Sequence, residues 1–252
     1  MDDDGLLYRV YERRLLKELA AFELPRHLGV IIDGNRRWAK ATGASTAEGH
    51  RMGAAKIPEF LQWCEELGIG LVTVWMLSRD NLRRPPEELD ALYGIITDTV
   101  DLLVREGYAV RLAGNADILP APVRAAITCL RSDAEPTRGL TVNVAIGYGG
   151  REEIVDAVRE LVLDLGDQGL DAAQIAQAIS VESIAQHLYT AGQPDPDLII
   201  RTSGEQRLSG FLLWQSVHSE FWFCETYWPG FRRVDLLRAL RDFCKRERRF
   251  GA

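Results

Sequence analysis

The segment LGVIIDGNRRWAK, at residues 28–40, carries a dense group of side chains that could do chemistry. Its β-branched run at 30–32 is typical of an interior strand of a parallel sheet, because both of its faces are apolar. A carboxylate, a glycine, an asparagine and two arginines follow at once, before a helical pattern begins. Backbone N–H groups and the positive end of a helix therefore converge beside Asp33.

An anion site that contains its own carboxylate indicates a metal. Gly34 permits close approach of the backbone, and the guanidinium groups of Arg36 and Arg37 suit phosphate oxygens. Asp33 would repel a bare anion, but it is suited to hold Mg²⁺ that bridges to a diphosphate. An N-cap aspartate followed by a solvated basic turn explains the same residues about equally well.

A second polar segment, SRDNLRRPPEEL, begins at Ser78, follows an apolar run and precedes a helix opened by two prolines. In one interpretation, Ser78 and Asn81 are hydrogen-bonding groups of a site. In the other, which this segment alone favours, they belong to a capped loop with Asp80 or Asn81 as its turn residue.

A third polar segment, LIIRTSGEQRLSGFLLW, again sends a strand pattern into a polar turn. Arg201, Arg207 and Ser209 lie within nine positions there and predict a second anion site. Glu220 begins the aromatic run EFWF, where a lone carboxylate is costly to bury unless it meets a cation or a metal. The glycine-rich turn AIGYGGREEI lacks the spacing of a phosphate loop and indicates only close packing.

Neither the four histidines nor the four cysteines show the spacing of metal ligands. The cysteines are expected to be small buried hydrophobes rather than disulfide partners. His50 follows Gly49 at the start of a helical pattern, where it could face an anion. A lone histidine is more often structural or solvated.

Size and composition favour one α/β domain spanning residues 1–252. The chain has 252 residues, of which 46% are hydrophobic, which is enough for one sizeable core. A formal net charge of −7 gives no support to a nucleic-acid partner. No apolar run approaches the ~20 residues that span a bilayer, and the start MDDDGLLYRV is acidic, so a cytoplasmic protein without a transmembrane segment is expected.

Strand and helix patterns alternate along the chain, which predicts an α/β fold with a mostly parallel central sheet of about six strands flanked by helices. The expected strands lie at 28–33, 69–77, 109–114, 140–146, 197–202 and 219–225. The expected helices lie at 5–22, 47–67, 86–106, 120–132, 151–165, 172–189 and 233–247, with a flexible loop at 164–171. Ligands bind beyond the carboxyl ends of parallel strands, so five polar segments are expected to meet there: 33–38, 78–84, 147–151, 201–209 and the neighbourhood of Glu220.

Taken in this order, the segments resemble the cis-prenyltransferase family, the Z-isoprenyl diphosphate synthases that include undecaprenyl diphosphate synthase. The resemblance covers nearly the whole chain, and several motifs in one order are more specific than any one of them. The matching stretches are HLGVIIDGNRRWAK, GH at 49–50, SRDNLRRPPEEL, NVAIGYGGREEIV, DLIIRTSGEQRLSGFLLWQ, SEFWF and the terminal RERRFG.

The resemblance implies an enzyme that condenses isopentenyl diphosphate with an allylic diphosphate, with Mg²⁺ as cofactor. Asp33 would bind the metal, and Glu220 would complete the metal site. Asn81, with Ser78 nearby, matches the position often assigned to proton removal, although the leaving diphosphate could itself be the base. The residues implied in substrate binding are Gly34, Asn35, Arg36, Arg37, Trp38, His50, Ser78, Arg79, Asp80, Arg84, Arg201, Arg207, Leu208, Ser209 and Gly251.

Members of the family are homodimers, so the resemblance also implies a second copy of the chain as partner. The tail at 245–252, with Arg249, Phe250 and Gly251, would lie at the dimer interface and reach the partner's site. A fraying basic tail is the alternative. The N-terminal helix lies within 1–24, and release of an apolar product implies possible transient contact with a membrane.

The chemistry expected of the family fits the polar segments. Positive charge develops on the allylic carbon as diphosphate leaves, so a metal and arginines lower the barrier by stabilising the departing anion. Orientation of the second substrate supplies a further contribution, and an apolar tunnel would take the growing chain. Ile57, Leu61, Leu89 and Leu92 could line that tunnel, although ordinary core packing explains them equally well.

Departures from the family pattern bear on product length. Trp75, Met76 and Leu77 stand where long-chain members tend to have smaller residues, and bulky groups would block extension. The expected helix near 87–106 is also shorter than in long-chain relatives. Both features predict a short product such as Z,E-farnesyl diphosphate from geranyl diphosphate or a similar primer. Thr46 stands where many relatives have an arginine beside the allylic diphosphate.

Four other functions are consistent with parts of the sequence. The same fold could make a long decaprenyl or undecaprenyl chain, or serve as a non-catalytic partner subunit. Such a subunit would be expected to lose its metal carboxylate or arginine pair, but Asp33, Arg201, Arg207 and Glu220 are all retained. Binding of nucleotides or RNA is conceivable from the anion sites alone. An unusual head-to-middle condensation is a narrower alternative, and the retained Ser78, Asn81 and Glu220 favour ordinary head-to-tail elongation.

Overall fold

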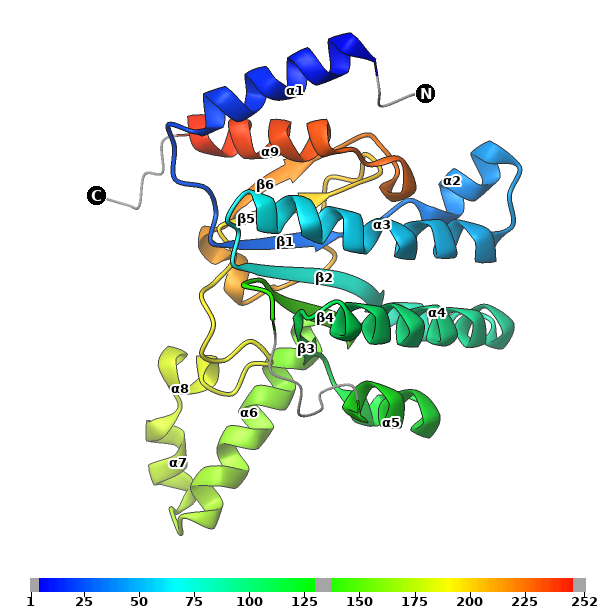
Figure 1. Ribbon diagram of the computed structural model, residues 1–252. Helices are drawn as coiled ribbons and strands as arrows, with labels where there is room; N and C mark the ends of the chain where they lie inside the picture. Colours follow the sequence, from blue (N-terminus) through cyan, green and yellow to red (C-terminus); the bar gives the residue numbers. More distant parts are fainter. Residues whose placement is uncertain (1–4, 130–136, 247–252) are drawn as a thin grey trace.

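Six parallel strands form one sheet in the part of the chain that the computed structural model describes, residues 5–129 and 137–246. The strand order is β3-β4-β2-β1-β5-β6, and every neighbouring pair is parallel (Figure 1). The predicted α/β class is therefore confirmed. The strands are β1 (His27–Ile31), β2 (Leu71–Ser78), β3 (Ala109–Ala113), β4 (Thr141–Tyr148), β5 (Leu198–Arg201) and β6 (Glu220–Phe223).

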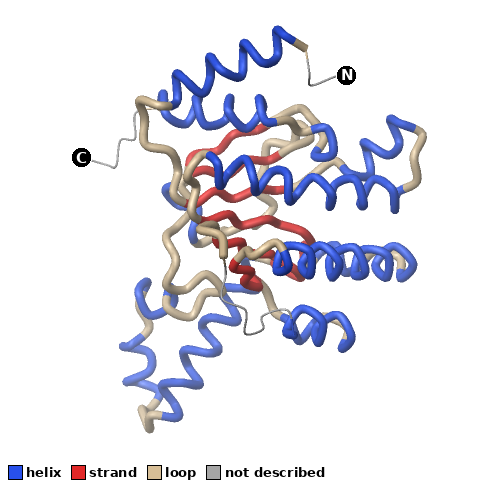
Figure 2. Tube along the Cα trace, viewed as in Figure 1, coloured by secondary structure: helices blue, strands red, loops and turns tan. Residues whose placement is uncertain are grey.

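The helices flank this sheet, with α1 packed on α9 near β6 and α6 to α8 extending away from the sheet (Figure 2). None of the described helices is long and apolar enough to span a bilayer. The α-helices are α1 (Leu6–Leu19), α2 (Asn35–Thr42), α3 (Thr46–Glu66), α4 (Pro86–Arg105), α5 (Ala121–Cys129), α6 (Gly150–Asp167), α7 (Ala172–Ala178), α8 (Val181–Ala185) and α9 (Arg233–Lys245). Four short turns are 3₁₀-helical: η1 (Asp80–Arg83), η2 (Ala116–Ile118), η3 (Gln215–His218) and η4 (Trp228–Gly230).

Two expectations about the end of α6 and the segment that follows it are wrong. Residues 164–167, expected in a loop, form the last turn of α6. The helix expected at 172–189 is two short helices, because Ile179 and Ser180 are extended and Ser180 caps α8 in a reciprocal capping box with Ser183. The part of the predicted helix 120–132 beyond residue 129 lies outside the described residues.

Local sequence signals place the helices that surround the carboxyl ends of β1 and β2. Gly34, with φ of +104°, turns the chain out of β1 into α2, and Gly43 ends that helix in the same left-handed region. Ser45 and Glu48 then form a capping box that starts α3. Pro86 starts α4, where its missing N–H costs no hydrogen bond.

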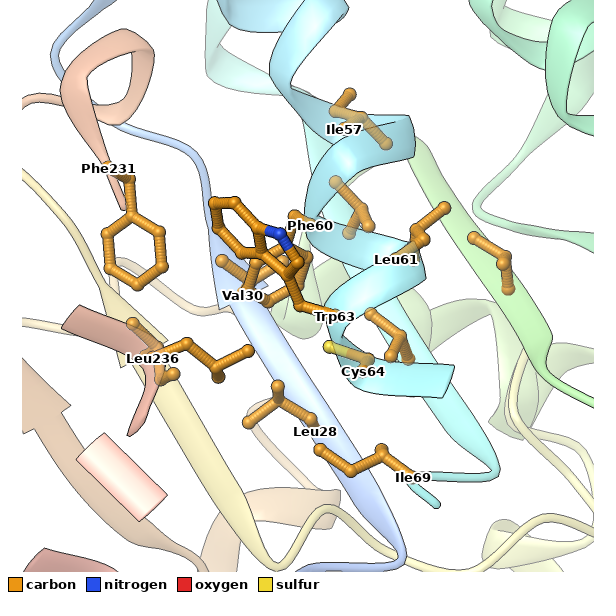
Figure 3. Close-up of a cluster of buried hydrophobic side chains, with 14 of the residues drawn as sticks. Leu28, Val30, Ile57, Phe60, Leu61, Trp63, Cys64, Ile69, Phe231 and Leu236 are labelled. Atoms are coloured by element: carbon orange, nitrogen blue, oxygen red, sulfur yellow. The ribbon is translucent and has the colours of Figure 1, made fainter. Parts of the chain in front are cut away.

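The largest core lies between the sheet and helices α3, α4 and α9. Leu28 and Val30 of β1 and Phe60 and Leu61 of α3 belong to this core, and Figure 3 shows Phe60 beside Val30. The other face of the sheet packs against the segment that follows β5, and the Trp75 ring stacks on Phe211 with centroids 5.1 Å apart. Burial on both faces explains why the central strands are almost continuously apolar.

A bulge interrupts β2 at Met76. Trp75 pairs with Ala145 and Leu77 pairs with Ile146, so Met76 has no register partner on β4. Side chains alternate between faces in a regular strand, but the extra residue resets this alternation. Trp75 packs on the Phe211 side, as regular alternation after Val74 requires. The bulge turns Leu77 to the other face, so that Met76 and Leu77 both pack toward the core that contains α3 and α4.

Candidate active site

A cavity of about 920 Å³ opens at the carboxyl ends of β1, β2 and β5, between these strands and helices α2, α3 and α4. Parallel strands bring residues 31, 75 and 201 into one row, since Ile31 pairs with both Trp75 and Arg201. The polar segments that follow these strands therefore meet, as the sequence predicted. Of the predicted site residues, the cavity is lined by Asp33, Gly34, Asn35, Arg36, Arg37, His50, Ser78, Asp80, Asn81, Arg84, Arg201, Arg207 and Ser209.

Asp33 lies between two arginines. Its Oδ2 accepts a hydrogen bond from Arg201 Nη2 at 2.9 Å and lies 3.3 Å from Arg37 Nη2. Burial, the largest influence, favours the neutral carboxyl, but hydrogen bonds from Arg201 and Ser203 and the charges of Arg201 and Arg37 outweigh it, so the pKa of Asp33 is lowered. Asp33 is therefore an anion rather than the N-cap of α2, a position that Gly34 occupies.

Arg201 organises the turn that contains the second predicted anion site. Its Nη1 donates to Ser209 Oγ at 3.0 Å and to the carbonyl of Arg207. The Arg201 side chain is only 6% exposed and its Nε has no hydrogen-bond partner among the described residues. A buried guanidinium with an unused donor beside a cavity is suited to a ligand oxygen.

Gly34 is required at its position for two reasons. Its φ of +104° is rarely adopted by residues with a Cβ. A Cβ built there would lie 2.7 Å from Tyr227 Cδ1 and 3.0 Å from Ser203 Cβ. The turn between β1 and α2 therefore packs tightly against the segments that follow β5 and β6. Arg37 Nη2 donates a 2.6 Å hydrogen bond to Ser203 Oγ, which joins α2 to the segment after β5.

Glu88 gathers three cationic or basic groups on the α4 side of the cavity. Its Oε1 lies 3.1 Å from Arg84 Nη1, 3.3 Å from His50 Nε2 and 3.9 Å from Arg36 Nε. Sequence reasoning missed this residue. Its position four residues after Arg84, in the first turn of a predicted helix, was the available signal.

Two opposing influences act on His50. Burial is the largest and lowers its pKa, and the charges of Arg84 and Arg36 act in the same direction. The hydrogen bond and the charge of Glu88 oppose them. The net effect is a lowered pKa, so neutral imidazole predominates at pH 7 before an anion binds.

Ser78 and Asn81 both line the cavity, and they also form the capped turn that was the alternative interpretation. Ser78 Oγ accepts a hydrogen bond from the backbone N–H of Asn81 at 3.1 Å. This contact starts the turn η1 and fixes both residues at the end of β2. The structural and the functional interpretation of this segment are therefore compatible.

Glu220 does not lie with the other predicted residues, so the expectation that it lies near the carboxyl edge is wrong. It is the first residue of β6 and pairs with Leu198, the first residue of β5, whereas Arg201 ends β5 beside Asp33. First and last residues of parallel strands lie at opposite edges of a sheet. The Glu220 carboxylate is instead paired with Arg246, so one chain does not bring Glu220 to Asp33.

Four other predicted residues are not placed in the cavity. Trp38, Arg79 and Leu208 do not line it. The backbone of Arg79 donates to the Tyr148 carbonyl, and Leu208 packs against the cluster that contains Phe211. Gly251 lies outside the described residues, as do Arg249, Phe250 and most of the predicted interface tail.

The inner part of the cavity is apolar. Ile57, Met76, Leu92, Ile95 and Ile96 line it between α3, α4 and the end of β2. Two of the expected tunnel residues, Ile57 and Leu92, are therefore placed there, whereas Leu61 is fully buried core and Leu89 does not line the cavity. Polar groups at the mouth and an apolar interior suit an amphiphilic ligand with an anionic head.

Within residues 5–129 and 137–246, no group of three or more His, Cys, Asp or Glu side chains is placed to hold a metal ion. Mg²⁺ often takes only one or two protein carboxylates and completes its shell with water and phosphate oxygens. An ionised Asp33 at the rim of an arginine-lined cavity fits that donor set.

Comparison with known proteins gives consistent matches over nearly the full chain. The prenyltransferase family model described as undecaprenyl diphosphate synthase matches residues 31–251. A (2Z,6E)-farnesyl diphosphate synthase of Thermobifida fusca is 57% identical over 246 residues, covering 97% of each chain. An isoprenyl transferase 1 of Streptomyces avermitilis is 55% identical over 247 residues, covering 98% of this chain and 96% of the relative.

A third relative and one solved structure are also named as diphosphate synthases. A short-chain Z-isoprenyl diphosphate synthase of Mycobacterium leprae is 54% identical over 253 residues, covering 97% of this chain and 95% of the relative. The crystal structure of lavandulyl diphosphate synthase from Lavandula x intermedia with dimethylallyl diphosphate is similar, with a TM-score of 0.81 and 35% identity, covering 91% of this chain and 99% of that one.

Proposed function

The chain belongs to the prenyltransferase family of undecaprenyl diphosphate synthases, and from this premise we propose that it condenses isopentenyl diphosphate head-to-tail with an allylic diphosphate to form a short Z-configured isoprenyl diphosphate. The observation that carries the proposal is one cavity in which two arginine-rich anion sites share Asp33 above an apolar interior. Relatives at 54–57% identity named as short-chain Z-isoprenyl or (2Z,6E)-farnesyl diphosphate synthases support a short product such as Z,E-farnesyl diphosphate.

We assign the allylic diphosphate to the start of α2. The backbone from Gly34 to Arg37 and the side chains of Arg36 and His50 face the cavity there. The helix N-terminus favours negative charge, and the guanidinium groups add charge-assisted hydrogen bonds. The diphosphate of isopentenyl diphosphate is assigned to Arg201, Arg207 and Ser209, where Arg201 retains an unused buried donor.

We further propose Mg²⁺ as the cofactor, held by Asp33. Bound there, the ion would neutralise charge on a diphosphate and so assist its departure. The lowered pKa of Asp33 supports this role, because a metal ligand must be deprotonated.

The reaction breaks the bond between the allylic carbon and its diphosphate oxygen and forms a carbon–carbon bond to C4, the terminal alkene carbon of isopentenyl diphosphate. One proton then leaves C2, the methylene next to the substituted alkene carbon C3, so that the new double bond lies between C2 and C3. Arg36 and Arg37 stabilise the departing diphosphate. The second anion site holds the alkene against the allylic carbon, which supplies the orientation contribution. Asn81 and Ser78 lie at the end of β2, where they can orient a proton acceptor, or the released diphosphate can take the proton itself.

The apolar interior supports a short product. Met76 packs toward the α3 and α4 side, as alternation from Val74 requires, and it lines the cavity with Leu92 and Ile96. A bulky side chain at that depth limits the length of a chain that grows inward. Trp75 also lines the cavity, but it is stacked on Phe211, and Leu77 belongs to the core.

A homodimer is also part of the proposal. Glu220 lies at the sheet edge opposite Asp33, so it can serve a metal bound at Asp33 only if the two residues come from different copies. We place the enzyme in the cytoplasm, with transient membrane contact when an apolar product leaves.

The experiment that tests the proposed function is incorporation of labelled isopentenyl diphosphate by purified protein with dimethylallyl, geranyl or farnesyl diphosphate as primer, with Mg²⁺ or with a chelator. Metal-dependent incorporation that requires an allylic primer is expected. Failure of every primer in the presence of Mg²⁺ would favour the non-catalytic partner subunit instead.

A further inference from the structure

Glu88, which sequence reasoning missed, contacts Arg36 and His50 of the proposed allylic diphosphate site and also Arg84, a predicted substrate-binding residue that lines the same cavity. Its carboxylate lies 3.1 Å from Arg84, 3.3 Å from His50 and 3.9 Å from Arg36. These three residues come from the turn before α4, from α3 and from α2. The side chains of Glu88, Arg84 and His50 are 15%, 22% and 7% exposed, so their contacts are less screened than surface ion pairs, whereas Arg36 is 59% exposed and its longer contact is the weakest of the three.

A carboxylate in this place is unexpected if charge alone governs the site, because it repels a diphosphate. The carboxylate is explained if its main effect is to order the side chains that bind the diphosphate. Arg36 and Arg84 have long side chains that lose considerable rotamer freedom when they are ordered. A shared acceptor that already orders them before substrate binds reduces that cost at the moment of binding.

His50 gains a defined orientation from the same contact. Its ring is buried, and Nε2 faces Glu88 Oε1, so that nitrogen carries the proton that Glu88 accepts. Glu88 thereby fixes the orientation of the His50 ring at the cavity wall. In the variant Glu88→Gln, the amide has no charge, so it would stabilise the protonated form of His50 less than the carboxylate does.

We propose that Glu88 is a positioning residue for the allylic diphosphate: it holds Arg36, His50 and Arg84 in place before the substrate arrives. The inference deepens the proposed function and rests on it for the identity of the substrate. It makes no use of Asp33 or of the metal.

The test compares Glu88→Gln with Glu87→Gln, a matched control on the neighbouring exposed residue of the same helical turn. For Glu88→Gln, the KM of the allylic primer is expected to rise about tenfold, the size of one charge-assisted hydrogen bond, with the KM of isopentenyl diphosphate changed less than about twofold. Glu87→Gln should leave both KM values unchanged. An unchanged or lower KM for the allylic primer in Glu88→Gln would overturn the proposal, because it would show that Glu88 only repels the substrate.

Two readouts do not depend on turnover. The pKa of His50, followed by NMR with His50→Asn to assign its signal, should fall in Glu88→Gln because the hydrogen bond and charge of Glu88 raise it in the wild type. Binding of inorganic pyrophosphate, measured by calorimetry, should weaken about tenfold. An unaltered His50 pKa would overturn the proposal.

Thermal unfolding separates positioning from a structural role. An unfolding midpoint of Glu88→Gln close to that of wild type supports positioning, whereas a large fall with parallel increases in both KM values would show that Glu88 only joins α3 to α4. If no primer gives product with wild-type protein, the proposed function fails, while the His50 titration and pyrophosphate binding still decide the role of Glu88.

Discussion

Arg201 Nη2 lies 2.9 Å from Asp33 Oδ2, which joins the last residue of β5 to the carboxylate that follows β1. The same Arg201 donates to Ser209, and the same Asp33 faces Arg37. The two proposed diphosphate sites therefore share one arginine–aspartate pair at the carboxyl edge of the sheet. In the proposed complex, the guanidinium groups of Arg37 and Arg201 would offset part of the repulsion between the two diphosphates.

Asp33→Asn tests the carboxylate directly. We expect kcat to fall at least ~100-fold, because the change removes the charge proposed to hold Mg²⁺ but keeps the shape of the side chain. Steady-state kinetics at saturating Mg²⁺ measure the effect. Asp117→Asn is the control, since Asp117 is exposed and does not line the cavity. A kcat for Asp33→Asn within a few-fold of wild type would contradict the assignment.

Met76→Ala tests what limits product length. Removing a bulky side chain from the α3 and α4 side of the cavity should lengthen the product by one or more isoprene units, which chromatography of dephosphorylated products resolves. Met52→Ala is the matched control, because Met52 lies on α3 with its side chain 46% exposed and outside the cavity lining. Products of unchanged length from Met76→Ala would place the limit elsewhere in the cavity.

Gly34→Ala and Gly43→Ala separate close packing from backbone strain. Both glycines have positive φ, but a Cβ at Gly43 meets no atom within 4 Å, whereas one at Gly34 meets Tyr227 at 2.7 Å. We expect Gly43→Ala to lower the free energy of unfolding by about 1 kcal/mol and Gly34→Ala by about 2 kcal/mol more. Denaturant titration measures both. Equal losses would show that the turn accommodates a side chain beside Tyr227.

The buried His27 should make the free energy of unfolding fall at acidic pH. It is fully buried at the start of β1, where its ring lies between the Pro194 carbonyl and Thr73 Oγ1, and burial lowers its pKa to about 4. In the unfolded chain His27 takes up a proton near pH 6.5, so its stabilising contribution is present above that pH and is lost as the pH falls toward 4. The loss should reach ~3 kcal/mol.

Denaturant unfolding of wild type and His27→Gln at several pH values measures this contribution. The difference in free energy of unfolding between the two proteins should shrink as the pH falls from 7 to 4. A difference that does not change with pH would show that His27 is not the residue responsible.

The sequence was sufficient to predict the position of Asp33, Arg201 and Ser209, because each ends or follows an apolar strand and parallel strands end at one edge. The same rule was misapplied to Glu220, which begins its strand and therefore lies at the other edge. Strand polarity separates these cases: Arg201 ends its strand at the carboxyl edge, whereas Glu220 begins its strand at the opposite edge.

Other features depend on contacts that no local pattern carries. The bulge at Met76 arises from unequal pairing of β2 with β4, and the apolar run VWML gives no sign of it. Glu88 acquires its role from Arg36 and His50, which are about 40 to 50 residues away along the chain. The break between α7 and α8 could have been found, since Ser180 and Ser183 have capping spacing.

The most direct test of the central claim is the structure of the product formed from geranyl diphosphate and isopentenyl diphosphate with Mg²⁺. Mass spectrometry should give a fifteen-carbon product, and NMR of the dephosphorylated alcohol should show that the new double bond is Z. A Z product of many isoprene units would keep the proposed chemistry and refute the assigned chain length. A new E double bond, or a branched carbon skeleton, would contradict the account.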